Sequence, residues 1–155
     1  MKKNVSFYLL IFLSATSSMF ALDTTDHKTI NQIIEHFSNA WNYHEGQGSA
    51  DYYAEDADFV NIFGMAFAGK QEIEIRHIKI HETFLKGSTF EVIELRLREA
   101  RPEVVIAHVY WKVSNIQKPG KDPLNETMKG IFTHVFLKNH DKWEIIATQN
   151  TPISN

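Results

Sequence analysis

The chain contains no cysteine among its 155 residues. This absence excludes disulfide bonds, thiol catalysis and thiolate metal sites, so stability has to come from core packing, with dimerisation as a further source. The sequence also contains no glycine-rich phosphate loop, no dinucleotide-binding fingerprint and no serine-triad motif. We therefore expect no nicotinamide or flavin site, and no cofactor of another kind.

Long apolar runs are also scarce, and the one at the start is short. Lys2 and Lys3 precede the apolar residues VSFYLLIFL, the small-residue run SATSS, and MFA. This order is typical of a secretory signal peptide. The run is shorter than the roughly 20 residues that span a bilayer, which disfavours a retained membrane anchor. We expect residues 1–21 to be a signal peptide cleaved after Ala21. Residues 22–155 would then be a single exported domain, periplasmic or secreted, with no stable membrane insertion.

Basic residues are outnumbered by acidic ones. The chain has 16 Lys and Arg against 19 Asp and Glu. Removal of Lys2 and Lys3 with the signal peptide would leave 14 basic residues and a net charge of −5. Nucleic-acid binding needs a basic face that neutralises phosphates. This charge balance therefore argues against a nucleic-acid partner.

The first half of the mature chain predicts helices around one strand. Residues 24–45 form an expected helix, because apolar residues recur there at helical spacing: Ile30, Ile33, Ile34, Phe37 and Trp41. The other expected elements are a short helix or turn at 50–57, a strand at 58–64, a bend or short hairpin before Gly69, and a helix at 70–87 that ends at Gly87.

The second half predicts strands only. They are expected at 89–99, 104–113, 130–138 and 143–151. Residues Val105, Ala107, Val109, Trp111 and Val113 alternate onto one face, and a slip in the alternation at Val92–Ile93 indicates a bulge. Helices that precede antiparallel strands indicate the α+β class. A strongly bent antiparallel sheet wrapped against these N-terminal helices would enclose a cavity.

Four motifs carry a family resemblance: AWNYHEG, YYAEDADFVNIFG, AGKQEI and WEIIATQNT. With the element order, they resemble the NTF2-like superfamily, and within it the SnoaL-like group that includes the names SgcJ/EcaC and DUF4440. The resemblance covers about residues 27–152. It implies an NTF2-like (cystatin-like) cone with a pocket between helices and sheet, and commonly a homodimer through the sheet. Because the superfamily includes isomerases, dehydratases, cyclases and binding modules, it does not fix the activity.

Asn61 is a polar residue in an apolar segment, so it either faces solvent or lines the expected pocket. In the ketosteroid-isomerase branch of that superfamily, a catalytic aspartate lies three residues before the glycine matching Gly64. Asn61 occupies that position, and an amide cannot serve as the base. Phe37 occupies the position of that branch's oxyanion-donating tyrosine. The resemblance therefore implies that Asn61 orients a ligand rather than removing its proton.

His77 and His81 lie four residues apart, on one face of the expected helix at 70–87. Three interpretations stay open: structural residues, an acid/base pair in the pocket, or ligands of a metal ion. No metal site is expected from two histidines alone. Asp58 is either a histidine partner or an ordinary turn acid. Arg76 would clamp an acidic ligand if it faced the pocket, but its place beside His77 favours a solvated surface charge.

The expected function is binding of a small, largely apolar molecule by a homodimer. The alternative is a cofactor-independent isomerase, dehydratase or cyclase in which His77 is the acid/base and Asp58 orients it. The expected polar contacts are Asn61, His77, His81, Gln149 and Asn150. The expected apolar walls are Phe37, Trp41, Phe59, Phe63 and Trp111.

Overall fold

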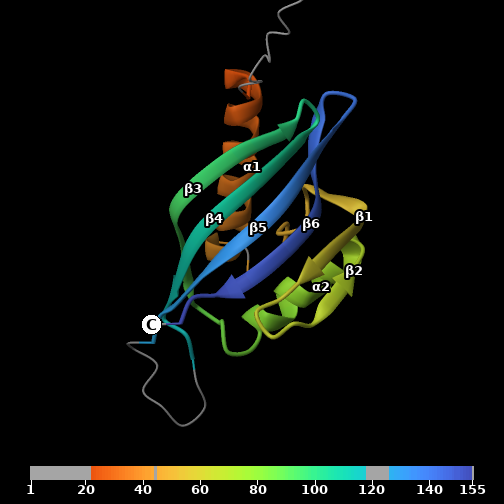
Figure 1. Cartoon of the computed structure of the whole chain (residues 1–155). Coiled ribbons are helices and arrows are strands. Elements are labelled where there is room, and N and C mark those ends of the chain that lie inside the picture. Colours follow the sequence, from red (N-terminus) through yellow and green to blue (C-terminus); the bar gives the residue numbers. More distant parts are fainter. Residues whose placement is uncertain (1–21, 44, 118–125, 155) are drawn as a thin grey trace, which may run out of the picture.

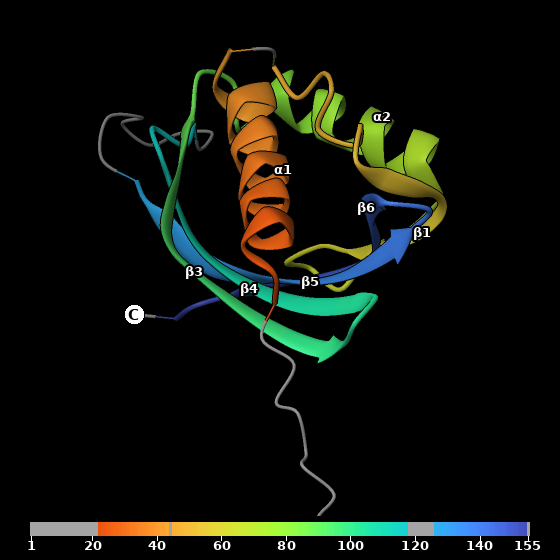
Figure 2. The same ribbon diagram turned by 90° about the horizontal axis from the view of Figure 1, so that it is seen from above.

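A curved six-stranded sheet holds two helices in its concave side (Figure 1; Figure 2). The computed structural model describes residues 22–43, 45–117 and 126–154, so the expected signal peptide lies outside the described residues. The elements are α1 (Thr24–Tyr43), β1 (Tyr53–Val60), β2 (Ala66–Ala68), α2 (Lys70–His81), β3 (Thr89–Arg101), β4 (Val104–Ser114), β5 (Met128–Asn139) and β6 (Lys142–Pro152). The strand order is β2-β1-β6-β5-β4-β3. Neighbouring strands are antiparallel except β1 and β6, which are parallel.

The helix α1 is fixed to the sheet at both of its ends. Near its start, the carboxylate of Asp26 accepts hydrogen bonds from Lys138 Nζ and Trp143 Nε1, each at 2.9 Å. Near its end, the side chain of Asn42 exchanges two hydrogen bonds with the backbone of Phe90, at 2.8 and 3.0 Å. Between these anchors its apolar face is buried, as the helical spacing predicts. This arrangement holds Phe37 and Trp41 over the concave face of the sheet.

The first strand begins and ends earlier in the chain than the sequence predicts. The helix or turn expected at 50–57 and the strand expected at 58–64 are replaced by turns up to Tyr52 and by β1. The reason is that Tyr53, Ala57 and Phe59 are buried while the acidic residues between them are exposed, which is the pattern of a strand. As a consequence, Asn61 lies in the turn that follows β1 rather than within a strand.

Other boundaries are closer to expectation. The hairpin is confirmed by the pairing of β1 with β2. The helix expected at 70–87 ends at His81, and turns lead from there to Gly87. The bulge is confirmed, because Val92 pairs with Trp111 and Glu94 with Tyr110, which leaves Ile93 as the extra residue.

Gly130 allows an indole ring to lie across the floor of the sheet. It pairs with Trp111 on the neighbouring strand. A Cβ atom at Gly130 would overlap the Trp111 ring and would lie 2.7 Å from the carbonyl oxygen of Thr151. With hydrogen at this position, Trp111 reaches across β5 and donates from Nε1 to Asn150 Oδ1 on β6, at 3.1 Å. A side chain at this one position would therefore displace both Trp111 and Asn150.

We predict that Gly130→Ala lowers the free energy of unfolding by about 1–3 kcal/mol, the usual cost of overpacking. Urea unfolding followed by tryptophan emission measures this change. In a Trp111→Val background the same substitution should cost less, because the overlapping ring is gone and only the close contact with the Thr151 carbonyl remains. An equal cost in both backgrounds would show that contact with Trp111 is not the cause.

Candidate functional site

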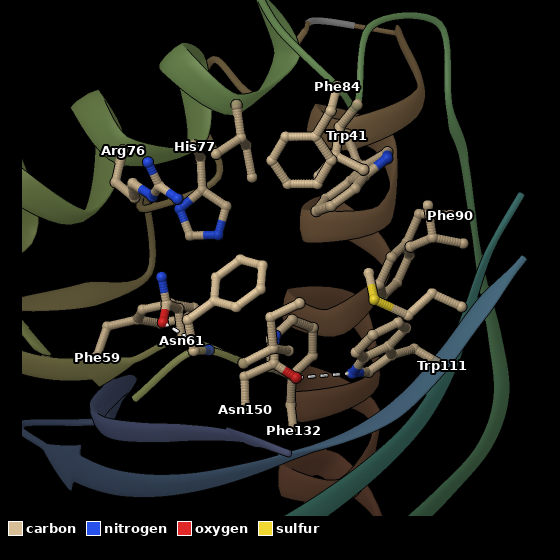
Figure 3. A pocket seen from close by; sticks show the side chains of 16 residues that line it. Trp41, Phe59, Asn61, Arg76, His77, Phe84, Phe90, Trp111, Phe132 and Asn150 are labelled. Carbon is tan, nitrogen blue, oxygen red and sulfur yellow. Dashed lines mark hydrogen bonds between the residues drawn. The ribbon is translucent and has the colours of Figure 1, made fainter. Parts of the chain in front are cut away.

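A cavity of about 50 Å³ lies between α2, the turn after β1 and the concave face of the sheet (Figure 3). This volume has room for about three or four water-sized groups. Most of its lining is apolar, and seven of the twelve apolar residues are aromatic: Trp41, Phe59, Phe63, Phe84, Phe90, Trp111 and Phe132. Its polar lining residues are Asn61, Arg76, His77 and Asn150.

His77 presents a hydrogen-bond acceptor to the cavity. Its ring is 2 % exposed and lies edge-on to Phe37 and Phe59, with centroids 5.5 and 5.1 Å away. Its Nδ1 lies 2.8 Å from the carbonyl oxygen of Ile73, one turn earlier in α2. Because a carbonyl oxygen only accepts, Nδ1 carries the proton and Nε2 keeps a lone pair. Figure 3 shows the imidazole directed into the cavity.

The imidazole of His77 is neutral at ordinary pH. Burial disfavours the charged ring and lowers its pKa to about 4, although the hydrogen bond to the carbonyl of Ile73 acts in the opposite direction. The charges of His81 and Arg76 lower the pKa further, and that of Glu74 raises it. A neutral imidazole with a free Nε2 can accept a proton or a hydrogen bond from a molecule in the cavity.

Asn61 lines the cavity and is 7 % exposed. Its Oδ1 accepts hydrogen bonds from the backbone N–H groups of Phe63 and Met65, at 2.9 and 3.0 Å, which closes the turn after β1. These bonds occupy the oxygen and leave the amide NH₂ available. Figure 3 shows this nitrogen directed towards His77 and Arg76. Asn61 therefore lines the pocket rather than facing solvent, and its oxygen also closes a turn, which the sequence does not predict.

Asn150, on the opposite side of the cavity, also uses its side-chain oxygen in an internal hydrogen bond. Its Oδ1 accepts from Trp111 Nε1, and its NH₂ has no hydrogen-bond partner within the part of the chain that the structure describes. Both asparagines thus use their oxygen atoms internally. Each of them offers donors to the space that they border.

Arg76 lines the cavity, so the prediction of a solvated surface charge is wrong. Its guanidinium lies 5.5 Å from the centroid of the Phe67 ring, and the side chain lines the cavity. Consecutive helix positions do point in different directions, but an arginine side chain is long enough to turn back along apolar surface. The neighbouring Phe67, which the sequence analysis did not consider, provides that surface. Because Phe67 lies on β2 and Arg76 on α2, the sequence carried no local signal for this contact.

Asp58 does not orient His77, so of its two interpretations the histidine partner, on which the alternative enzyme relied, is wrong. Asp58 is exposed and lies between Ala57 and Phe59, which both face the core, so its side chain points away from the cavity. The carbonyl oxygen of Ile73 occupies the orienting position instead. Alternation along β1 explains the error, since it separates residue 58 from residue 59.

Three further expected contacts lie outside the cavity lining. Phe37 is buried behind it, against His77 and Phe132. His81 is buried with its ring 4.6 Å from Trp41, and its Nδ1 lies 2.8 Å from the carbonyl oxygen of His77. Gln149 is exposed. By contrast, Trp41, Phe59, Phe63, His77, Trp111, Asn61 and Asn150 all line the cavity, as expected.

The metal interpretation gains no support from the geometry. In the described ranges, no group of three or more His, Asp or Glu side chains could hold a metal ion. His77 and His81 each direct Nδ1 at a backbone carbonyl. No helix in these ranges is long and apolar enough to cross a membrane.

A third buried histidine, His134, belongs to a hydrogen-bond network that the sequence does not predict. His134 Nδ1 lies 2.8 Å from Thr148 Oγ1, and that hydroxyl lies 2.9 Å from Tyr53 Oη. Burial lowers the pKa of His134 to about 3 and raises the pKa of Tyr53. The network connects β5, β6 and β1, which adjacent sequence positions could not reveal.

Comparisons with known proteins identify the fold of the chain. No family model and no curated protein matches the chain. Among solved structures, a domain of unknown function with a cystatin-like fold from Nostoc punctiforme is 26 % identical, with a TM-score of 0.73 over 86 % of this chain and 80 % of that one. An NTF2-like protein of unknown function from Pseudomonas putida is 17 % identical, with a TM-score of 0.67 over 87 % and 92 %. A putative scytalone dehydratase from Novosphingobium aromaticivorans is 10 % identical, with a TM-score of 0.71 over 84 % and 85 %. The chain has the NTF2-like, cystatin-like fold.

We predict that acid destabilises the protein through His77 and His134. Both folded-state pKa values lie below the ordinary value of 6.5, so the unfolded chain takes up protons first as the pH falls. The contribution of each neutral ring is complete above about pH 6.5 and is lost as the pH falls towards about 4 for His77 and about 3 for His134. Urea unfolding at about pH 7.5 and about pH 5 measures this loss.

The variant His77→Gln isolates one of the two rings. Between these pH values it should lose less stability than the wild type, by on the order of 2 kcal/mol. His140→Gln is the matched control, because His140 is exposed. If His77→Gln and the wild type show the same pH dependence, then His77 is not buried in its neutral form.

Proposed function

We propose that this chain is an exported protein that binds a small, largely apolar molecule in the cavity beneath α2. The observation that carries the proposal is the arrangement of its polar groups. His77, Asn61 and Asn150 each use one atom to fix the local structure. Each leaves its other polar atom beside an aromatic cavity. Ligand pockets commonly combine an apolar lining with a few polar groups that fix orientation.

The size of the cavity sets a condition on the ligand. About 50 Å³ holds only a few heavy atoms, so a ring-sized body requires the mouth to widen. Phe63 lines the cavity and is 65 % exposed, so its outward movement breaks few packing contacts. The neighbouring Ile62 is half-buried and also lines the cavity. We therefore place ligand entry beside the turn that Asn61 closes.

An enzyme is the second candidate, and the free Nε2 of His77 favours it. A neutral imidazole at an apolar site can remove a proton from a bound molecule, as an isomerase, dehydratase or cyclase without a redox cofactor requires. This alternative requires that His77→Gln abolish turnover while leaving ligand binding in place. A binding protein would use the same cavity without turnover.

We also propose a homodimer formed through the outer face of the sheet. The helices lie on the other face (Figure 2). Half-exposed apolar residues gather on the outer face, where Ile106 pairs with Val135 and Tyr110 with Ile131. Such a surface fits a second copy of the chain. The sequence motifs support two further parts of the proposal. The chain is exported with cleavage after Ala21, and it belongs to the SnoaL-like group that includes SgcJ/EcaC and DUF4440.

We predict that residues 22–155, purified without added ligand, carry an organic adduct in native mass spectrometry. Ile80→Trp should remove it, because Ile80 lines the cavity and a larger side chain would fill it. Ile75→Trp is the matched control, with the same substitution on the same helix at an exposed position. The same spectra should show the mass of a dimer.

Two results would count against these proposals. An adduct that persists in Ile80→Trp lies elsewhere on the protein, which would contradict binding in the cavity. A monomer mass at micromolar concentration would contradict the dimer. A wild type without any adduct would restrict the proposal to weak or transient binding, for which the titrations described below are the test.

A further inference from the structure

The cavity holds a positive charge that the protein itself does not balance. Arg76 is the charged residue of its lining, and the described lining residues contain no Asp or Glu. Within the described ranges, Arg76 forms no salt bridge and no hydrogen bond to another side chain. Its guanidinium lies over the ring of Phe67, which fixes its position without neutralising it. A half-buried cation without an acidic partner is costly unless something else pairs with it.

The hydrogen-bonding groups around the cavity are mostly donors. Arg76 carries five N–H donors and no acceptor. Asn61 and Asn150 each offer an NH₂ group, because their oxygen atoms already accept two bonds and one bond, respectively. Against these stands one clear acceptor, Nε2 of His77. A ligand that satisfies this set has to bring more acceptors than donors.

Two of the donors, Arg76 and Asn61, lie on the side of the cavity away from the rings of Trp111 and Phe90. Figure 3 shows Arg76, Asn61 and His77 together on one side, with Trp111 and Phe90 on the other. Phe90 and Trp111 are stacked with centroids 6.4 Å apart, and Phe132 lies 5.8 Å from Trp111. A molecule bound here would meet donors at one end and apolar ring faces at the other.

We propose that the cavity selects an organic monoanion, a carboxylate on a short apolar or aromatic body. This inference rests on the proposed binding function and specifies its ligand class. The carboxylate pairs with the guanidinium of Arg76 and accepts from the NH₂ of Asn61. Charge-assisted bonds of this kind are about twice as strong as neutral ones, and the planar guanidinium matches the geometry of a carboxylate. The apolar body lies among the aromatic rings.

The test is a set of titrations of residues 22–155 followed by tryptophan emission, since Trp41 and Trp111 line the cavity. The probes are benzoate and cyclohexanecarboxylate, with the neutral molecules benzamide and benzyl alcohol as their counterparts. We expect each acid to bind at least about tenfold more tightly than its neutral counterparts. Ile80→Trp should abolish binding of the acids, which locates it in the cavity.

Arg76→Gln should weaken binding of the two acids by about 10–100-fold and leave the neutral probes nearly unchanged. Arg101→Gln is the matched control, because it removes the same charge at an exposed position at the end of β3. Arg76→Lys keeps the positive charge but loses the planar guanidinium that binds both carboxylate oxygens. It should therefore bind the acids more weakly than the wild type and more tightly than Arg76→Gln. The thermal midpoint of each variant confirms that it folds.

The outcomes separate this inference from the proposed function. If neutral probes bind as tightly as acids, or if Arg76→Gln behaves like Arg101→Gln, selection of an anion is overturned while binding in the cavity stands. If no probe binds the wild type, the anion inference is also overturned. Binding in the cavity fails as well only if native spectra show no organic adduct.

Discussion

The hydrogen bond from His77 Nδ1 to the carbonyl oxygen of Ile73 determines the character of the site. It fixes the tautomer of a ring that burial keeps neutral, and so decides that an acceptor rather than a donor faces the cavity. The bond lies within one turn of α2, so the helix itself maintains it. Proton transfer in the cavity depends on that lone pair, and a neutral ligand with a donor group would bind to it.

Each asparagine at the cavity uses its side-chain oxygen in an internal hydrogen bond and leaves its NH₂ group free of partners among the described residues. Asn61 closes a turn and Asn150 holds an indole, and each keeps its NH₂ group for the interior. The hydrogen bonds that fix these side chains make their free donors rigid, which lowers the entropic cost of binding a ligand. Gly130 contributes indirectly, because the space above it lets Trp111 reach Asn150. The fold thus positions these donors through contacts within a turn and between strands.

The sequence was sufficient to predict the α+β class, the buried face of α1, the bulge at Ile93 and seven of the sixteen residues that line the cavity. These features follow from periodicity and from motifs read along a single element. The errors have a common cause in contacts between elements. Tyr53–Val60 is a strand because it pairs with β6 and β2, and local pattern alone suggested a helix or turn. Asp58 and Arg76 were misjudged because strand alternation and the ring of Phe67 decide their directions.

The most direct test of this account is ¹⁵N NMR of the imidazole of His77 in residues 22–155, assigned by comparison with His77→Gln. The account predicts a neutral ring at neutral pH, with the proton on Nδ1 and an unprotonated Nε2 that responds when a cavity ligand binds. A ring with its proton on Nε2, or a protonated ring, would contradict it. In either of those cases the cavity would present a donor where the account requires an acceptor.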